Sequence, residues 1–301
     1  MKLLITGATG QVGSALCALA RQQRIEYQGL SSQELDITRE SKVLRAVRRA
    51  KADCVINAAA YTAVDLAEDD AERCYAVNRD GVRYLAKACR RHDIPMLHLS
   101  TDYVFDGSKK TAYLEDDEPG PLNVYGASKL AGEQLLRAEL RQHAIVRISW
   151  VFGESGGNFV KSIVRAALQK SELRVVDDQI GAPTPASDVA RVLVAMANQF
   201  DCGSRAWGTY HYSGMGVTSW YDFARDIVAE IEKHTDAEVA QILREKTANY
   251  GYRAQRPLNS QMHCRKILEA FGVKQRSWRP EMVKVVTHCL EQMRQSSPQS
   301  A

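Results

Sequence analysis

Three glycines, each three residues from the next, follow directly on the first apolar run of the chain. Leu3-Leu4-Ile5 is typical of a buried strand, and Gly7, Gly10 and Gly13 come after it at the start of a helix expected over Val12–Gln23. In a strand–turn–helix unit, such glycines permit a tight turn, close approach of a pyrophosphate, and close packing of the helix on the sheet. Free N–H groups at the helix N-terminus attract phosphate. An ordinary turn is the alternative, but the position directly after a strand favours a dinucleotide-binding α/β fold.

Apolar runs alternate with helical patterns through the first half of the chain. Further strands are expected at Tyr27–Leu30, Cys54–Ile56, Met96–Leu99 and Ala144–Ile148, and helices at Ser41–Lys51, Ala71–Arg91 and Leu130–Arg141. This alternation predicts a parallel sheet with helices on both faces. The continuous apolar runs fit strands that are buried on both sides.

After Trp150 the pattern becomes irregular and richer in turns. Helices are expected at Phe159–Gln169, Ser187–Gln199, Ser219–His234 and Pro280–Arg294, strands at Leu173–Val176 and Gly208–Tyr212, and a further packed segment at Cys264–Phe271. We predict a Rossmann-like doubly wound parallel sheet over residues 1–150, with segments at about 173–200 returning to it. Residues 151–294 are expected to form mainly a smaller C-terminal substrate-binding lobe, and residues 295–301 a frayed tail.

The composition excludes several classes of protein. The chain has 301 residues, a net charge of +4 and no concentrated basic run, which argues against nucleic-acid binding. No signal peptide precedes the first strand, and no window approaches the ~18 apolar residues of a membrane helix. The seven cysteines are scattered without CxxC spacing, so we expect small core residues in a reducing compartment, not disulfides or zinc ligands. The chain is therefore expected to be cytoplasmic, with no membrane and no nucleic-acid partner.

The choice between NADPH and NADH stays open at the end of the second strand. Gly29-Leu30-Ser31-Ser32 offers neither an acid for the ribose diol of NAD nor an Arg for the 2′-phosphate of NADP. Ser31 is compatible with either cofactor. Asp36 and Ile37 are expected to border the adenine, although Asp36 can equally cap the turn before Thr38.

Tyr125 and Lys129 are four residues apart, which places both side chains on one face of a helix. A nearby ammonium favours a phenolate and is expected to lower the pKa of the tyrosine. Thr101 follows an expected strand, at the sheet edge where ligands bind, and its hydroxyl could hold a substrate carbonyl. The small residues Ala58-Ala59-Ala60 follow another strand and leave room for a ribose and nicotinamide. A surface helix pair and a capping hydroxyl are the alternative interpretations of these residues.

Seven segments carry a resemblance to a known family. They are Leu4–Gly13, Asn57–Asp65, Ser100–Gly107, Pro121–Glu133, Arg147–Gly153, Asp178–Thr184 and Arg256–Ser260. In this order they resemble the extended short-chain dehydrogenase/reductases and, within that superfamily, the dTDP-4-dehydrorhamnose reductases. Tyr61–Asp65 and Asn123–Gly126 are more specific than the superfamily motifs.

The resemblance implies an NAD(P)H-dependent enzyme that reduces the C4 keto group of dTDP-4-dehydro-L-rhamnose to give dTDP-L-rhamnose. Thr101, Tyr125 and Lys129 would be catalytic, with hydride from nicotinamide C4 and a proton from Tyr125. NADPH is the expected cofactor and NADH the alternative. The cofactor residues would be Gly7, Thr9, Gly10, Gln11, Val12, Ser31, Asp36, Ile37, Ala58, Ala59, Ala60, Tyr125 and Lys129. The substrate residues would be Val64, Thr101, Asp102, Tyr103, Trp150 and Arg256.

For some of these residues a structural role is an equal alternative. Arg256 suits the substrate diphosphate or a surface salt bridge, and Trp150 and Tyr103 could simply pack. Some members of the family carry a metal-binding Glu after the glycine turn, where this chain has Ser14-Ala15-Leu16, and Ser187-Asp188 replaces an acidic pair. We therefore expect no metal, and a monomer or a homodimer.

Two other functions remain open at this stage. One is a non-catalytic NADP-binding regulatory subunit of a synthetase, similar to that of methionine adenosyltransferase. The other is a sibling nucleotide-sugar epimerase or dehydratase, for which Asp102, beside Thr101, is a formal candidate for the added acid. The intact set of Thr101, Tyr125 and Lys129 favours the reductase.

Overall fold

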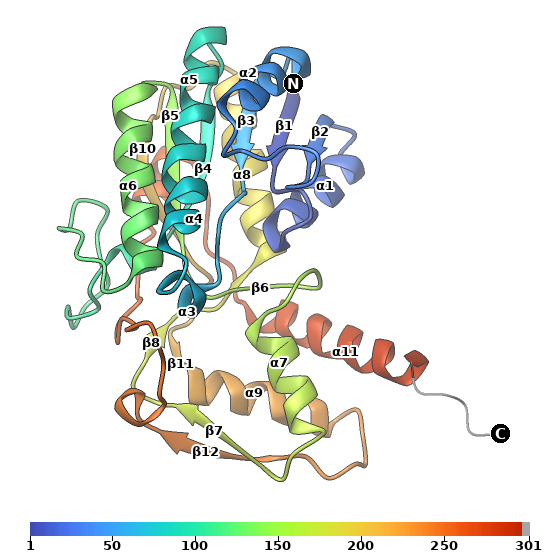
Figure 1. Cartoon of the computed structure of the whole chain (residues 1–301). Coiled ribbons are helices and arrows are strands. Elements are labelled where there is room, and N and C mark those ends of the chain that lie inside the picture. The colour runs from blue at the N-terminus through green and yellow to red at the C-terminus, as the bar shows by residue number, and fades with distance from the viewer. Residues whose placement is uncertain (297–301) are drawn as a thin grey trace.

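A six-stranded parallel sheet forms the larger lobe of the computed structural model, which describes residues 1–296 (Figure 1). Its strands are β1 (Lys2–Thr6), β2 (Glu26–Leu30), β3 (Cys54–Asn57), β4 (Met96–Thr101), β5 (His143–Ile148) and β10 (Gly208–Tyr212). The strand order is β10-β5-β4-β3-β1-β2, and every neighbouring pair is parallel. The chain order reverses between β1 and β3, which makes this the point where such sheets bind ligands beyond their carboxyl ends.

Helices cover both faces of the sheet (Figure 1). One face carries α1 (Gln11–Gln22), α8 (Ala186–Asp201) and α10 (Arg265–Phe271), and the other carries α2 (Glu40–Ala50), α5 (Val82–His92) and α6 (Val124–Glu139). The short helices α3 (Val64–Ala67) and α4 (Ala71–Tyr75) follow β3, and a π turn at Ala76–Gly81 joins α4 to α5. The doubly wound fold predicted from the alternating pattern is confirmed.

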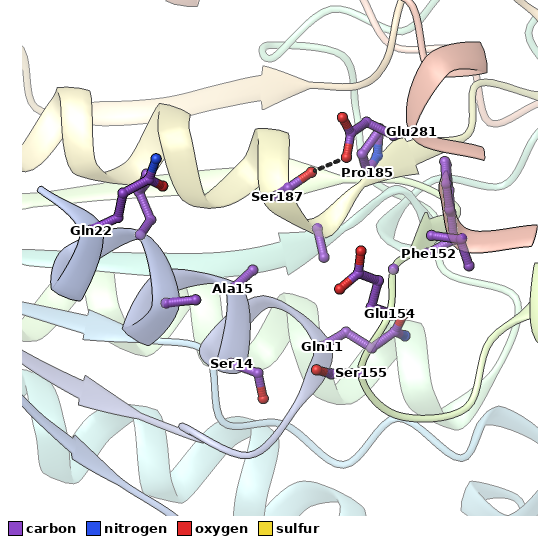
Figure 2. A pocket seen from close by; sticks show the side chains of 15 residues that line it. Gln11, Ser14, Ala15, Gln22, Phe152, Glu154, Ser155, Pro185, Ser187 and Glu281 are labelled. Atoms are coloured by element: carbon purple, nitrogen blue, oxygen red, sulfur yellow. Dashed lines mark hydrogen bonds between the residues drawn. The ribbon is translucent and has the colours of Figure 1, made fainter. Parts of the chain in front are cut away.

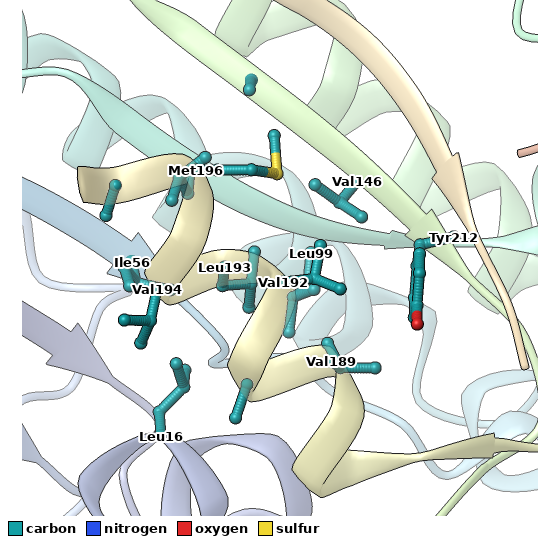
Figure 3. Packing of buried hydrophobic residues seen from close by; sticks show 14 of the residues in the cluster. Leu16, Ile56, Leu99, Val146, Val189, Val192, Leu193, Val194, Met196 and Tyr212 are labelled. Atoms are coloured by element: carbon teal, nitrogen blue, oxygen red, sulfur yellow. The ribbon is translucent and has the colours of Figure 1, made fainter. Parts of the chain in front are cut away.

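Successive strand residues enter opposite cores, as the two-residue repeat of a strand requires. Leu3 and Ile5 are fully buried beneath α1 and α8, whereas Leu4 is fully buried beneath α2 and α5. Figure 3 shows the first of these cores, where Val189 and Leu193 of α8 pack over the sheet. Burial on both faces explains why the strands are continuous apolar runs.

The smaller lobe lies below the carboxyl edge of the sheet (Figure 1). It contains α7 (Phe159–Ala167), α9 (Trp220–Glu232), α11 (Arg279–Ser296) and the parallel pair β7 (Glu172–Val176) and β12 (Gln241–Glu245). Short pairings join β6 (Val151–Phe152) to β9 (Thr184–Pro185) and β8 (Ile180–Gly181) to β11 (Thr218–Ser219), and 3₁₀ turns lie at Asp102–Val104 and Thr247–Asn249. The lobe has its own apolar core around the fully buried Trp278.

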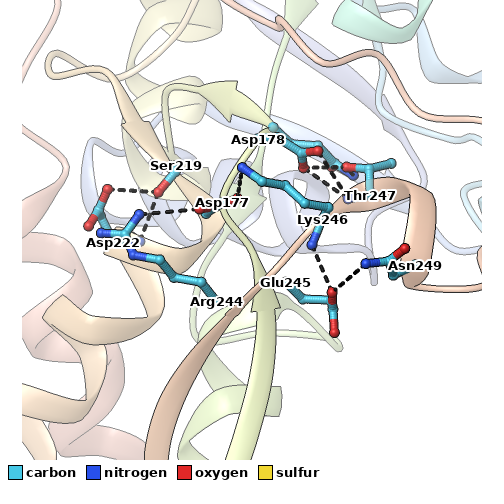
Figure 4. Close-up of polar contacts among 10 residues, drawn as sticks. Asp177, Asp178, Ser219, Asp222, Arg244, Glu245, Lys246, Thr247 and Asn249 are labelled. Carbon is cyan, nitrogen blue, oxygen red and sulfur yellow. Dashed lines mark hydrogen bonds and ion pairs between the residues drawn. The ribbon is translucent and has the colours of Figure 1, made fainter.

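Polar contacts fasten the ends of β7 and β12 together (Figure 4). Asp178 accepts hydrogen bonds from the backbone N–H of Thr247 at 3.0 Å and from its hydroxyl at 2.6 Å. Asp177 pairs with Lys246 at 2.7 Å and with Arg244 at 3.3 Å. These contacts hold the segment that leads from β7 into the turn at residues 179–181.

Several sequence-based boundaries were wrong. The long helix expected over Ala71–Arg91 is α4, a π turn and α5. The expected strand at Leu173–Val176 pairs with β12 in the smaller lobe, so the chain returns to the sheet at α8 and β10. Gln295 and Ser296 continue α11, and the rest of the expected tail, 297–301, lies outside the described residues. The strand β12 was missed because Gln241–Glu245 has no continuous apolar run.

The seven cysteines are free thiols, as expected, but one of them is not a core residue. Cys202 is exposed just after α8, and Cys17 is half-buried, whereas the other five are buried. Among residues 1–296, no helix combines the length and apolar character needed to cross a membrane.

Candidate active site

A cleft of about 430 Å³ opens beyond the carboxyl ends of β1, β3, β4 and β5. A second cavity of about 650 Å³ adjoins it, because Gly10 and Ala58–Ala60 line both. The cleft is lined by Gly10, Gln11, Val12, Ala58, Ala59, Ala60, Thr62, Val64, Leu99, Ser100, Thr101, Asp102, Tyr103, Tyr125, Lys129, Ile148, Trp150, Val151, Gly156 and Gly157. We call these two spaces the catalytic cleft and the adenosine-side cavity, after the roles proposed for them below.

The glycine turn fits a dinucleotide. Gly7 has φ +70°, and a Cβ there would lie 2.6 Å from the backbone N of Ala59. A Cβ on Gly13 would lie 2.0 Å from the carbonyl O of Gly7, so the helix packs on the turn without room for a side chain. Gly10 precedes α1 without any side-chain cap, which leaves the first N–H groups of the helix free for phosphate oxygens.

Asn57, at the end of β3, positions the segment Ala58–Ala60, which lines both spaces. Its Oδ1 accepts hydrogen bonds from the Thr6 hydroxyl at 2.6 Å and from the Ala59 N–H at 3.1 Å. Its Nδ2 lies 3.0 Å from Nδ1 of the buried His98 on β4. The side chain therefore ties three neighbouring strands together at the point where the chain turns into the alanines.

The π turn supports the same region from the helical side. Asn78 donates to the Tyr61 carbonyl at 3.0 Å and accepts from the Tyr61 N–H at 2.9 Å. It also donates to the Ser128 hydroxyl on α6 at 3.0 Å. A π turn often lies at a functional site, and here Ala76 and Val77 of this turn line the adenosine-side cavity.

Tyr125 and Lys129 both lie on α6, as their spacing predicts, and both reach the cleft. Asn123 caps the helix by accepting a hydrogen bond from the Gly126 N–H at 2.8 Å, which places Tyr125 in the first turn. Lys129 lies one turn later, almost fully buried, and its Nζ donates to the Leu99 carbonyl at 2.7 Å. Thr101 is the last residue of β4, so the three expected catalytic side chains line one cleft.

The electrostatics of the pair differ from the expectation. Burial raises the pKa of Tyr125 above its usual range, while a hydrogen bond with Thr101 opposes the rise. Burial lowers the pKa of Lys129 to about 8, and the charge of Glu133 opposes that change. The predicted lowering of the tyrosine pKa is therefore wrong for this structure, because loss of hydration outweighs the hydrogen bond with Thr101.

Asp102 is 2% exposed beside Thr101, and burial raises the pKa of its carboxyl to about 6. Its Oδ1 accepts a hydrogen bond from the Thr101 hydroxyl at 3.1 Å. Its Oδ2 is buried without a hydrogen-bond partner in the described chain. Buried carboxyl oxygens are rarely left unpaired, and interactions of this carboxyl with Ser260 and Thr101 oppose the rise in its pKa.

Tyr103, Trp150 and Val64 line the same cleft, as the resemblance implies. The ring of Tyr103 packs edge-on to that of Tyr125, with 5.6 Å between centroids. Trp150 has φ +48°, an uncommon conformation for a bulky residue. Its ring stacks at 3.7 Å on Trp220 from α9, so it lies where the two lobes meet.

Two of the expected ligand residues are engaged elsewhere. Arg256 forms a two-point ion pair with Asp65, at 2.6 and 3.0 Å, and lies 3.6 Å from the ring centroid of Tyr252. Ser31 hydrogen-bonds to Glu34 at 2.7 Å, and neither it nor Arg256 lines either space. By contrast, Asp36 and Ile37 line the adenosine-side cavity, and Asp36 also caps the turn through Thr38.

Other lining residues were missed from the sequence. Val151, Gly156 and Gly157 reach the catalytic cleft from the loop around β6, where the adjacent glycines gave the only signal. Arg73 lines the adenosine-side cavity from α4, and no pattern around it points to a cofactor.

A third cavity, of about 260 Å³, lies beside α1 (Figure 2). Ser14 and Ser187, the positions that depart from the metal-binding pattern, both line it, and the Ser187 hydroxyl donates to Glu281 at 3.0 Å. Lys284 also pairs with Glu281, at 2.6 Å. Across residues 1–296, no three His, Cys, Asp or Glu side chains are grouped closely enough to hold a metal ion.

The doubly wound sheet, its glycine turn and the tyrosine–lysine pair define a nucleotide-dependent oxidoreductase of the short-chain dehydrogenase/reductase type. Within this class, the chain belongs to the family of the RmlD substrate binding domain, which matches residues 1–291.

Individual relatives agree with that assignment. A dTDP-4-dehydrorhamnose reductase from Aggregatibacter actinomycetemcomitans is 44% identical over 92% of this chain and 95% of its own length. Another from Sinorhizobium fredii is 40% identical over 95% of this chain and 97% of its own. The crystal structure of dTDP-4-dehydrorhamnose reductase from Bacillus anthracis, in complex with NADP, superposes with a TM-score of 0.86 at 32% identity and covers 97% of this chain and 99% of that one.

Proposed function

We propose that this chain reduces the C4 keto group of dTDP-4-dehydro-L-rhamnose, with NADPH as the hydride donor, to give dTDP-L-rhamnose. The observation that carries the proposal is the convergence of Thr101, Tyr125 and Lys129 in one cleft beside the glycine turn. The similarity to dTDP-4-dehydrorhamnose reductases over nearly the whole chain supports the choice of substrate.

The residues present fit a dinucleotide along the two adjoining spaces. The pyrophosphate binds at the uncapped start of α1, over Thr9, Gly10, Gln11 and Val12. Asp36 and Ile37 border the adenine, and the small Ala58–Ala60 floor leaves room for the ribose beside Lys129. When bound, the reduced nicotinamide supplies the hydride for the substrate carbonyl carbon.

Tyr125 donates the proton that the carbonyl oxygen gains. A phenol whose pKa lies above its usual range carries its proton at neutral pH, which is the form that a general acid needs. Thr101 orients the carbonyl oxygen by a hydrogen bond, and the Lys129 ammonium binds the ribose and stabilises the phenolate that remains. Water leaves the cleft as the sugar enters between the lobes.

The sugar is held by side chains of both lobes. Asp102 accepts or donates a hydrogen bond at a sugar hydroxyl, Tyr103 and Trp150 pack on the ring, and Val64 closes the side of the cleft. Arg256 reaches the diphosphate if it exchanges one of its two contacts with Asp65 for a phosphate oxygen. These roles, a cytoplasmic location and a monomeric or homodimeric state remain predictions.

The test is NAD(P)H oxidation with a small panel of 4-keto-6-deoxy nucleotide sugars. We expect turnover that depends on the keto sugar, with added NADPH consumed stoichiometrically. Stoichiometric co-purification with a synthetase and no NADPH oxidation with any of the sugars would instead identify a regulatory subunit. Conversion of a sugar with no added cofactor, by protein that retains NAD, would identify an epimerase.

A further inference from the structure

The adenosine-side cavity contains one cation that no acidic side chain neutralises. Among its lining residues, Arg73 is the sole Lys or Arg. Its exposed side chain forms no hydrogen bond or ion pair with any other residue that the structure describes. Other arginines near the cofactor region are paired: Arg79 with Asp80 at 2.8 Å, and Arg39 with Asp36 at 3.6 Å. Arg73 thus stands out as an uncompensated positive charge on the wall of a ligand cavity.

The position of Arg73 follows from the helix that carries it. Arg73, Ala76 and Val77 are spaced by three and four residues, so they lie on one face where α4 runs into the π turn. All three line the adenosine-side cavity, as do Ser32 and Asp36 of the loop after β2. An exposed guanidinium on a long stem at this place is available to an anion bound in the cavity.

The charge balance of the cavity indicates an anion. Asp36 is the single acid among the lining residues, and its Oδ1 is already used by the backbone N–H and the hydroxyl of Thr38. Because Tyr125 and Lys129 place the nicotinamide in the catalytic cleft, the adenosine half belongs in this cavity. NADPH differs from NADH there by a single 2′-phosphate, which carries about two negative charges.

We propose that Arg73 binds the 2′-phosphate and is the residue that makes this chain select NADPH over NADH. The inference rests on the proposed function, because it takes the dinucleotide in the orientation that reduction requires. A guanidinium presents two parallel N–H donors to phosphate oxygens. The Ser32 hydroxyl, which lines the same cavity, supplies a further donor. The selectivity determinant therefore comes from α4, 43 residues beyond Leu30 at the end of β2, where such a residue is usually sought.

The decisive experiment is calorimetric titration of the full chain with 2′,5′-ADP and with 5′-ADP, which requires no sugar substrate and no turnover. In Arg73→Gln we expect affinity for 2′,5′-ADP to fall about 10–100-fold, as for loss of charge-assisted hydrogen bonds. Affinity for 5′-ADP should change less than about twofold, since the phosphate turn is untouched. Arg73→Lys keeps the charge but lacks the paired N–H donors of a guanidinium. Its affinity for 2′,5′-ADP should therefore lie between that of wild type and that of Arg73→Gln.

Arg39→Gln is the matched control, because it removes a neighbouring cation that does not line the cavity. If Arg39→Gln loses 2′,5′-ADP affinity while Arg73→Gln retains it, the inference is overturned in favour of Arg39. Equal losses of both nucleotides in Arg73→Gln would overturn it as well, because Arg73 would then stack on the adenine. If wild-type protein binds neither nucleotide, the proposed use of NADPH is itself contradicted. If wild-type protein binds both nucleotides with equal affinity, only the Arg73 inference is overturned.

Discussion

Tyr125 enters the cleft as a protonated phenol, and burial raises its pKa further above neutral pH. Lys129 is nearly fully buried beside it, and its pKa falls to about 8. Sequence spacing is enough to place the two side chains on one helix face, but it contains no information about hydration. That is why the direction of the tyrosine shift could not be predicted.

Removing the phenol oxygen tests its role as the acid. In Tyr125→Phe we expect kcat to fall about 10²–10⁴-fold, the usual contribution of general acid catalysis, with little change in NADPH affinity. Stopped-flow or steady-state NADPH oxidation and fluorescence titration measure the two quantities. Tyr250→Phe, at an exposed tyrosine outside the cleft, is the control. Turnover close to wild type in Tyr125→Phe would exclude this residue as the proton donor.

The carboxyl of Asp102 should make stability depend on pH. Its folded-state pKa, about 6, lies above the unfolded value of 3.8, so it contributes stability that is complete below the unfolded pKa and is lost as the pH rises through 6. The amide side chain that replaces the carboxyl in Asp102→Asn does not titrate in this pH range. Relative to wild type, the variant should therefore gain roughly 1 kcal/mol of unfolding free energy between pH 5 and pH 8.

Urea unfolding at the two pH values measures this difference. Asp116→Asn, on the surface, serves as the control. A difference between Asp102→Asn and wild type that is the same at pH 5 and pH 8 would mean that the Asp102 carboxyl does not carry the raised pKa.

At the scale of elements, α6 and the π turn act together. The first turn of α6 carries Tyr125, and the helix is held against the π turn through the contact between Asn78 and Ser128. Gly132 makes this approach possible, because a Cβ there would lie 2.0 Å from the Asn78 carbonyl O. The sequence predicts a helix at both places. It does not reveal the π turn at Ala76–Gly81, because this turn is short and a helical segment lies on each side of it.

A single methyl group at this contact should therefore disturb both elements. We expect Gly132→Ala to lower the unfolding free energy by about 1–3 kcal/mol, the usual cost of overpacking, and to reduce kcat as Tyr125 shifts. Urea unfolding and NADPH oxidation are the measurements. Gly157→Ala is the control for stability, since nothing lies within 4 Å of a Cβ at that position. Equal stability of the two variants would show that the contact tolerates a side chain.

At the scale of the whole molecule, the cleft is closed by residues from both lobes. Trp150, just after β5, stacks on Trp220 from α9. Asp65 of α3 pairs with Arg256, which precedes α10 in the chain. Chain segments more than 60 residues apart thus pack together beside the cleft, and of these four residues Trp150 lines it. No local pattern in the sequence identifies Trp220 as the partner of Trp150.

Loss of the stacking between Trp150 and Trp220 should weaken binding of the nucleotide sugar more than binding of the cofactor. In Trp220→Ala we expect KM for the nucleotide sugar to rise about 2–10-fold, matching the energy of an aromatic pair, while NADPH affinity stays near wild type. Trp207→Ala removes a tryptophan that packs on Phe200 away from the cleft, and is the control. An unchanged KM in folded Trp220→Ala would show that the stack does not shape the sugar site.

The sequence by itself determined the doubly wound sheet, the glycine turn and the placement of Tyr125 and Lys129 on one helix face, because each depends on local spacing. A glycine triplet after a strand, continuous apolar runs and a tyrosine–lysine pair four residues apart have the same meaning wherever the chain folds. The sequence also predicted that Asp36 and Ala58–Ala60 line the site, because they follow strands whose carboxyl ends lie at the same edge of the sheet.

Only the tertiary structure decided which distant residues complete the site and how they are charged. Arg73 reaches the adenosine-side cavity from α4, and Arg256 pairs with Asp65, 191 residues earlier in the chain. The burial that raises the pKa of Asp102 likewise comes from long-range packing. Contacts and hydration of this kind depend on distances between segments, and local sequence patterns carry no record of those distances.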